Sequence, residues 1–172
     1  MLIKVYGSAV FGVEATTITV EVNIDTGIAF NLVGLPDSAI KESSYRIQAA
    51  LKNVGYKFPG KKITINMAPA DLRKEGSAYD LTLALGILVA SSQIKAQAIG
   101  DFIIMGEMSL DGSLQPIKGA LPIAIKARQE GFKGFILPRQ NAKEAAIVDG
   151  LEVYGVENIT EVIDFFNEDK PL

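Results

Sequence analysis

The sequence contains no cysteine, no histidine and no tryptophan among its 172 residues. Without cysteine there is no disulfide framework and no thiol nucleophile, and the loss of both cysteine and histidine excludes a Cys/His zinc site. The missing imidazole also excludes a Ser-His-Asp triad and a histidine general base. Any catalysis by this chain must therefore use carboxylates, lysine, arginine, tyrosine, hydroxyl groups or the backbone.

The chain also lacks the marks of a membrane or secreted protein. No apolar run approaches the roughly 20 residues that a membrane-spanning helix needs. The first seven residues, M-L-I-K-V-Y-G, have no long apolar core after a basic start, so they do not resemble a signal peptide. The absence of cysteine is compatible with a reducing compartment. We therefore expect a cytoplasmic protein or fragment without membrane contact.

The composition is that of a folded domain with a small excess of acid. Hydrophobic residues make up 48% of the chain and charged residues 22%, and the length suits one ordinary domain. The net charge is -3 and the pI is about 5.1. Because domains that grip phosphates are usually basic, the composition disfavours nucleic-acid binding by the domain as a whole and leaves room only for a local basic patch.

The hydrophobic pattern predicts a strand-rich start. Strict alternation from Thr17 to Asp25 is typical of a half-buried strand, and residues 28–35 are expected to be its antiparallel partner. Asp111-Gly112 predicts a hairpin turn. Further strands are expected over 2–10, 62–67, 103–110, 114–117, 135–137 and 152–154.

Helical spacing follows in the middle of the chain. Asp37 is expected to cap a helix that stops at Gly55, and the apolar run Asp80–Ala90 indicates a buried helix. Further helices are expected over 119–130, 141–148 and 159–166, the last one capped by Asn158. The elements together predict a mixed α/β domain, an α+β arrangement of helices on a mixed sheet around one core.

One segment has the outline of a phosphate-binding loop. Residues 55–61 match G-x-x-x-x-G-K, but the next residue is Lys62, where a serine or threonine should hold Mg²⁺. Phosphate loops run from a strand into a helix, whereas this segment runs from a helix into a strand. The pattern therefore predicts a helix stop and a turn and not an ATP site.

Five basic residues flank the strand expected at 62–67, namely Lys57, Lys61, Lys62, Arg73 and Lys74. If both groups lie at one edge, they form a surface that can face the phosphates of DNA in an otherwise acidic domain. The alternative is a set of solvated side chains without a partner, which is usual for lysines beside a turn.

Two other polar groups allow a chemical interpretation. Asp71, Glu75 and Asp80 could form a Mg²⁺ site, but their spacing shows no clear ligand pattern, and helix capping explains Asp80. Ser77 could be a nucleophile only with a lysine as its activator, and spacing identifies no such lysine. The residues themselves therefore assign no metal site and no catalytic group.

Two stretches carry a family resemblance. V-G-L-P-D-S-A-I-K-E-S-S-Y-R (33–46) and N-M-A-P-A-D-L-R-K-E-G (66–76) resemble the N-terminal domain of the magnesium-chelatase-like AAA+ proteins, the ComM/YifB family. The motifs occur in the family's order, and the resemblance runs over essentially the whole chain. M-G-E-M-S-L-D-G-S-L-Q-P-I-K-G (105–119) and G-F-K-G-F-I-L-P-R-Q-N (131–141) are similar to the proteolytic domain of Lon proteases and the Lon-like domain of RadA. The resemblance implies a Lon-like α/β sandwich.

Lon enzymes are Ser-Lys peptidases, so the resemblance also names two positions. The serine position falls at about Ala78, with Ser77 one residue away, and the lysine position falls at Ile123. Lys118 and Lys126 do not coincide with it. Since a lysine must reach the serine to take its proton, the resemblance implies a Lon-like scaffold without the peptidase dyad.

The resemblance implies that residues 1–166 form the Lon-like domain and that residues 167–172 form a linker toward an AAA+ module absent from this chain. ATP and magnesium belong to that module, and no cofactor is expected here. The implied role is that of a non-catalytic accessory domain in a hexameric, DNA-processing AAA+ protein that acts by branch migration in natural transformation and positions DNA or a partner. Two alternatives stay open, a diverged serine peptidase that uses Ser77 and an interaction module without DNA contact.

Overall fold

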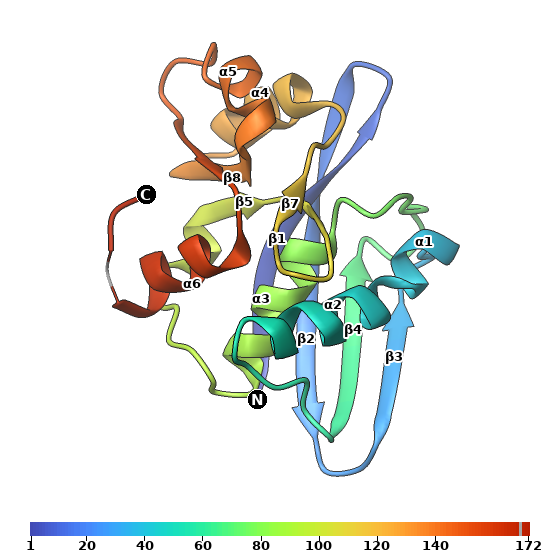
Figure 1. Ribbon diagram of the computed structural model, residues 1–172. Helices are drawn as coiled ribbons and strands as arrows, with labels where there is room; N and C mark the ends of the chain where they lie inside the picture. The colour runs from blue at the N-terminus through green and yellow to red at the C-terminus, as the bar shows by residue number, and fades with distance from the viewer. Residues whose placement is uncertain (169) are drawn as a thin grey trace.

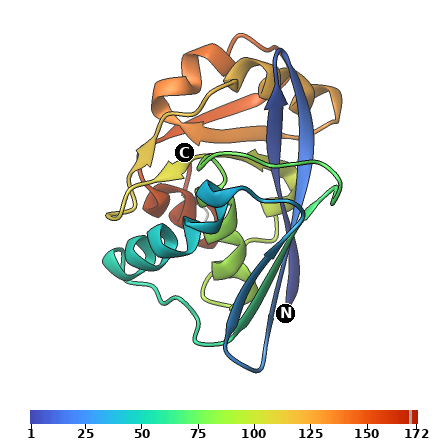
Figure 2. The same cartoon turned by 90° about the vertical axis from the view of Figure 1, so that its right-hand side faces the viewer.

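The computed structural model describes residues 1–168 and 170–172 and has helices on both faces of a twisted sheet (Figures 1 and 2). In the described residues seven strands join in the order β3-β4-β2-β1-β5-β8-β9, and β6 and β7 form a separate hairpin. The strands are β1 (Leu2–Phe11), β2 (Glu14–Asp25), β3 (Ala29–Val33), β4 (Lys62–Ala68), β5 (Phe102–Ile104), β6 (Glu107–Met108), β7 (Leu114–Gln115), β8 (Gly134–Pro138) and β9 (Glu152–Val156). The helices are α1 (Ser38–Lys41), α2 (Ser43–Asn53), α3 (Asp80–Ala90), α4 (Ala120–Gln129), α5 (Ala142–Ala145) and α6 (Ile159–Glu168), with short 3-10 turns η1 (Ile99–Asp101) and η2 (Arg139–Asn141). The mixed α/β class expected from the sequence is confirmed.

The order of the first strands differs from the expected hairpin succession. β1 and β2 form a long antiparallel pair, and β4 runs antiparallel to β2 on its other side. β3 then pairs with β4 in parallel, with Ala29 opposite Lys62. The expectation that residues 28–35 pair with Thr17–Asp25 is therefore wrong. The chain between β3 and β4 passes through α1 and α2, and a crossover of this kind joins parallel strands.

α3 is the central helix of the core. Ten of its eleven residues are buried, as its almost entirely apolar sequence predicts. It lies so close to the sheet that a Cβ added at Gly86 would come within 2.8 Å of Val22 Cγ2. On the opposite face of the sheet, α4 follows directly after Gly119, where an added Cβ would come within 2.8 Å of Val10 Cγ2. Helices thus cover both faces of the β1–β2 pair.

The strand expected over 103–110 is interrupted at Met105–Gly106. The Gly106 N–H donates to Ala78 O at 2.7 Å, and the Leu81 N–H donates to Gly106 O at 2.9 Å. The chain thus leaves the sheet after β5 to bond with the segment that enters α3, and β6 starts a new hairpin. The turn at Asp111-Gly112 closes that hairpin as expected, with the Asp111 carboxylate accepting from the Ser113 N–H at 3.0 Å.

The last helix runs further than the sequence indicates. α6 ends at Glu168, so Asn167 and Glu168 are helical although the expected linker spans 167–172. Residue 169, within that linker, lies outside the described residues. Asn158 caps α6 as expected, because its side-chain oxygen accepts from the Thr160 N–H at 3.0 Å. Among the described residues, no helix has the length and apolar character needed to cross a membrane.

Candidate functional site

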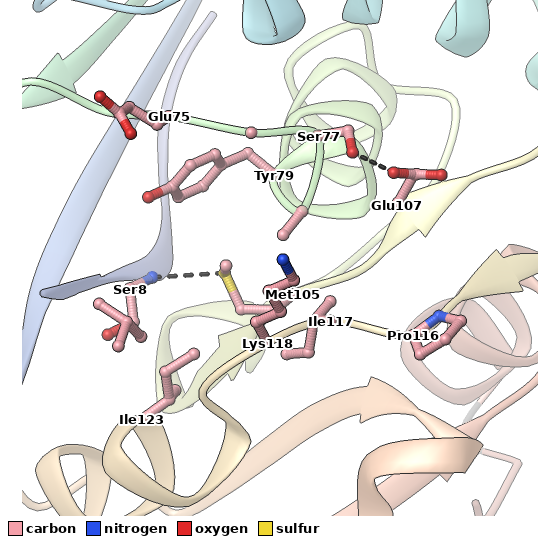
Figure 3. Close-up of a pocket in the computed structure, with 13 residues that line it drawn as sticks. Ser8, Glu75, Ser77, Tyr79, Met105, Glu107, Pro116, Ile117, Lys118 and Ile123 are labelled. Atoms are coloured by element: carbon pink, nitrogen blue, oxygen red, sulfur yellow. Dashed lines mark hydrogen bonds between the residues drawn. The ribbon is translucent and has the colours of Figure 1, made fainter. Parts of the chain in front are cut away.

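A pocket of about 380 Å³ opens where the segment entering α3 meets β1, β6 and the start of α4 (Figure 3). Its wall combines hydroxyl, carboxylate and ammonium groups with apolar side chains. The lining residues are Ser8, Val10, Glu75, Gly76, Ser77, Ala78, Tyr79, Met105, Glu107, Pro116, Ile117, Lys118 and Ile123. Segments that lie up to 115 residues apart in the sequence therefore share one wall.

Both positions that the Lon resemblance assigns to the dyad lie in this pocket. Ala78 stands at the serine position and Ile123 at the lysine position, and both line the cavity. Neither a methyl group nor an isoleucine side chain can exchange a proton. Lys118 lines the same pocket, whereas Lys126 lines a different one beside the β1–β2 turn.

Ser77 is the hydroxyl closest in sequence to the serine position. Its hydroxyl donates a hydrogen bond to the carboxylate of Glu107 on β6 (Figure 3). No hydrogen bond joins Ser77 to a lysine among the described residues. The pocket thus pairs a serine with a carboxylate, an arrangement suited to holding a polar ligand.

Tyr79 brings a buried phenol to the pocket wall. Its side chain is only 3% exposed, and its ring fills the space left by the absent side chain of Gly7, where an added Cβ would lie 3.4 Å from Tyr79 Cδ1. Burial raises the pKa of Tyr79 above its ordinary value, and the nearby Asp37 carboxylate adds to the effect. The phenol therefore stays protonated and can donate a hydrogen bond.

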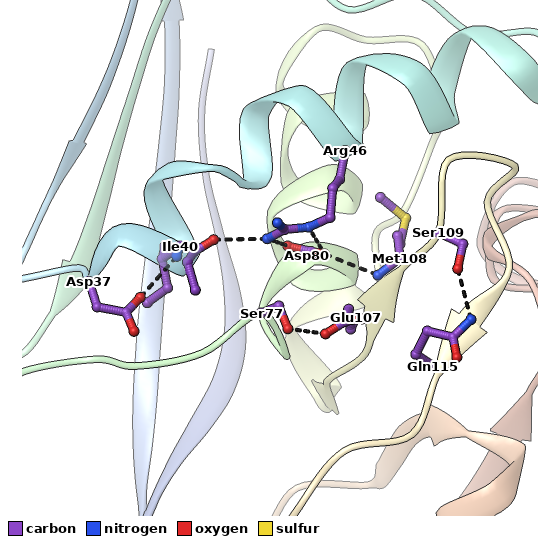
Figure 4. Close-up of polar contacts among 10 residues, drawn as sticks. Asp37, Ile40, Arg46, Ser77, Asp80, Glu107, Met108, Ser109 and Gln115 are labelled. Carbon is purple, nitrogen blue, oxygen red and sulfur yellow. Dashed lines mark hydrogen bonds and ion pairs between the residues drawn. The ribbon is translucent and has the colours of Figure 1, made fainter.

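Asp80 was expected to cap α3, and that expectation is wrong. Its carboxylate instead forms a two-pronged ion pair with Arg46 of α2, with Nε to Oδ2 at 2.7 Å and Nη2 to Oδ1 at 2.9 Å (Figure 4). It also accepts from the Met108 N–H at 3.0 Å. Burial raises the pKa of Asp80, although the bonds from Arg46 and Met108 act in the other direction. The pair joins α2, α3 and β6 behind the pocket.

The two family motifs bind one another through Lys74 and Asp37. Lys74 is fully buried, and its ammonium donates to Gly34 O at 2.7 Å and also to Pro69 O. Burial lowers the pKa of Lys74. The Asp37 carboxylate accepts from Ile40 N, which confirms the expected cap, and from Gly76 N, each at 2.9 Å. The motifs therefore fix the loop that enters the pocket.

The five basic residues of the expected DNA-facing patch do not share one surface. Lys57, Lys61 and Lys62 are exposed at the start of β4, whereas Arg73 follows its end, about 20 Å further along at the usual rise of a strand. Arg73 pairs with Glu75 at 3.3 Å. Lys74 is buried, and its ammonium group donates to Gly34 O, so it cannot contact DNA. The prediction that Lys74 belongs to the DNA-facing patch is therefore wrong.

Two of the three acidic residues considered for Mg²⁺ form ion pairs with different arginines. Asp80 is held by Arg46 and Glu75 by Arg73. Within the described residues no three aspartate or glutamate side chains gather as a metal site would require. Sequence reasoning missed the roles of Arg46 and Glu107, because their partners lie 34 and 30 residues away and no local pattern joins them.

Comparisons with known proteins place these features in a family. The model of a family described as subunit ChlI of Mg-chelatase matches residues 20–141. The chain is 41% identical to competence protein ComM of Haemophilus influenzae over 98% of its own length and 33% of that protein, and 42% identical to YifB of Escherichia coli over 85% of its length and 29% of that protein. It is 32% identical to Lon protease 2 of Bacillus subtilis over 74% of its length and 23% of that protein. The chain thus spans a third or less of these relatives.

Proposed function

Because the chain belongs to the family described as subunit ChlI of Mg-chelatase, with ComM and YifB among its relatives, we propose that it is a non-catalytic accessory domain of an ATP-driven, DNA-processing AAA+ protein. In this role the domain positions DNA or a partner protein and takes part in assembly of the ring. ATP and Mg²⁺ act in the AAA+ module, and the location is the cytoplasm.

The main support for a non-catalytic role is the identity of the residues at the two positions that correspond to the Lon serine and lysine. A Ser-Lys peptidase needs a hydroxyl and an amine within about 3 Å of one another. Ala78 and Ile123 stand at these positions, and the hydroxyl of the neighbouring Ser77 bonds to Glu107. We therefore infer that this Lon-like domain serves binding and assembly and not peptide hydrolysis. The similarity to ComM, a competence protein, supports DNA processing as the role of the whole protein.

A diverged peptidase is the second candidate, and one observation favours it. Ser77, Glu107 and Lys118 line the same pocket, so a movement of the Lys118 side chain could bring an amine to a serine. A fluorogenic peptide assay that compares the native chain with Ser77→Ala separates the candidates, because only a peptidase loses turnover with the hydroxyl.

DNA binding is tested by a salt titration of binding to single-stranded and branched DNA. About three phosphate contacts, one for each of the exposed residues Lys57, Lys61 and Lys62, predict that log affinity falls with log salt at a slope of roughly -2 to -3. Lys61→Glu/Lys62→Glu should weaken binding and flatten the slope, whereas the matched control Lys126→Glu/Lys133→Glu changes the net charge equally and should keep the slope. If the native chain does not bind at low salt, or all three slopes agree, the domain is an assembly module without DNA contact.

A further inference from the structure

The outward face of α2 carries a cluster of aromatic and lysine side chains. Tyr45, Lys52 and their neighbours line a shallow pocket of about 550 Å³ together with the segment that follows the helix. Tyr45 is 75% exposed, so most of its ring is open to a ligand. We call this surface the α2 strip; it consists of Tyr45, Gln48, Ala49, Lys52, Tyr56, Lys57 and Phe58.

The strip is held rigidly by the way α2 ends. Gly55 adopts a positive φ of 90° after the helix, and the Tyr56 N–H turns back to donate to Leu51 O at 2.8 Å. The side chain of Gln93 then clamps the backbone of Lys57, accepting from its N–H at 2.9 Å and donating to its carbonyl at 2.7 Å. The segment after α2 is thus fixed before any ligand arrives, and this reduces the entropic cost of binding.

The neighbouring ring of Phe58 is anchored in the sheet. It lies 5.8 Å from the ring of Phe30 on β3, measured between centroids. The ring of Phe58 therefore packs toward the sheet, whereas the ring of Tyr45 is exposed to solvent. The strip thus offers one exposed ring.

The charge of this region is opposite to that of the chain. Residues 38–62 carry six basic side chains and one acidic side chain, Glu42, whereas the whole chain has a net charge of -3. Arg46 is bound to Asp80. The ion pairs found in the described residues involve neither Lys52 nor Lys57, so both ammonium groups are available to an anion.

We propose that the α2 strip binds single-stranded nucleic acid, with a base stacked on Tyr45 and phosphates held by Lys52 and Lys57. An exposed ring beside lysines is a combination that single-strand binding surfaces use, because every base has a face that stacks and every nucleotide has a phosphate. In a duplex the bases already stack on one another, so a duplex offers only phosphates. The inference rests on the proposed DNA role and names its site and its substrate class.

The test measures binding of a fluorescent oligo-dT of about 15 nucleotides by anisotropy at several salt concentrations. Tyr45→Ala should weaken binding at least fivefold without changing the salt slope, and Tyr45→Phe should retain native affinity. Lys52→Gln/Lys57→Gln should lower the magnitude of the slope by about 1.4, since each phosphate contact contributes about 0.7. Phe11→Ala and Lys133→Gln, which change an exposed ring and an exposed lysine elsewhere, should leave binding unchanged.

The outcomes separate this inference from the proposed function. If the chain binds oligo-dT and Tyr45→Ala binds equally well, the strip is not the site while the DNA role stands. If the chain binds no DNA at low salt, both fail. Competition by poly-glutamate as strong as that by oligo-dT, or a duplex bound as tightly and with equal sensitivity to Tyr45→Ala, would also overturn the inference, because it would show attraction of charge without stacking.

Discussion

The buried ion pair between Arg46 and Asp80 gives the sharpest stability prediction. Arg46→Met keeps the length and apolar character of the side chain but leaves the Asp80 carboxylate, which is 1% exposed, without its cation. Removing one partner of a buried pair costs about 3–5 kcal/mol. Because the Arg46 side chain is 23% exposed, we expect the lower end, about 3 kcal/mol at pH 7. That is a large part of the stability of an ordinary domain.

The assay is urea unfolding followed by far-UV circular dichroism. The matched variant Arg46→Met/Asp80→Asn removes the stranded charge and keeps an acceptor for Met108 N, so it should recover roughly 1–2 kcal/mol of the loss. A single variant within about 1 kcal/mol of the native protein, or a double variant no more stable than the single one, would refute the reasoning.

The same pair predicts a dependence on pH. Burial already raises the pKa of Asp80, and losing Arg46 removes an interaction that lowers it. A carboxyl group with a folded-state pKa above its unfolded value contributes stability below the unfolded pKa and loses it as the pH rises through the folded pKa. The stability deficit of Arg46→Met should therefore shrink from pH 7 toward pH 4, and a constant deficit would contradict the assignment.

Three further predictions concern other parts of the chain. Gly34→Ala should prevent stable folding, because Gly34 has a φ of 103° and an added Cβ would lie 2.2 Å from Met67 O, whereas Gly12→Ala, with a φ of 64° and open space, should cost only about 1 kcal/mol in thermal unfolding. Asp37→Ala should cost about 1–2 kcal/mol because it removes the acceptor of two N–H groups, and an unchanged melting temperature would contradict this. A labelled ATP analogue should not bind this chain, since residues 55–61 lead into β4 and not into a helix; micromolar binding lost in Lys61→Ala would contradict that.

Local patterns predicted the elements of this fold and not their long-range pairing. The apolar run of α3 and the turn at Asp111-Gly112 are encoded within a few residues, so periodicity and turn chemistry identify them. The insertion of β4 between β2 and β3 depends on a crossover through α1 and α2, and no local pattern records which strand will lie beside another.

The same distinction holds for the candidate site. The resemblance placed Ala78 and Ile123 at the dyad positions, and the structure brings both to one pocket. The burial of Lys74 could not be predicted, because a lysine in a polar loop is ordinarily solvated and its acceptor, Gly34 O, lies 40 residues earlier. Neither Tyr45 nor Lys52 was predicted from the sequence as a site residue, and it is the turn at Gly55 that brings Tyr56 and Lys57 beside α2.

The most direct measurement of the central claim is peptide hydrolysis by this chain. Casein and a set of fluorogenic peptides are incubated with equal concentrations of the native chain, Ser77→Ala and Lys118→Met, with a matched surface variant, Lys133→Met, as the control for purity and folding. A binding scaffold predicts that all four preparations release product at the same background rate. Hydrolysis by the native chain that disappears in Ser77→Ala and Lys118→Met but persists in Lys133→Met would contradict the account and establish a serine–lysine peptidase in the pocket.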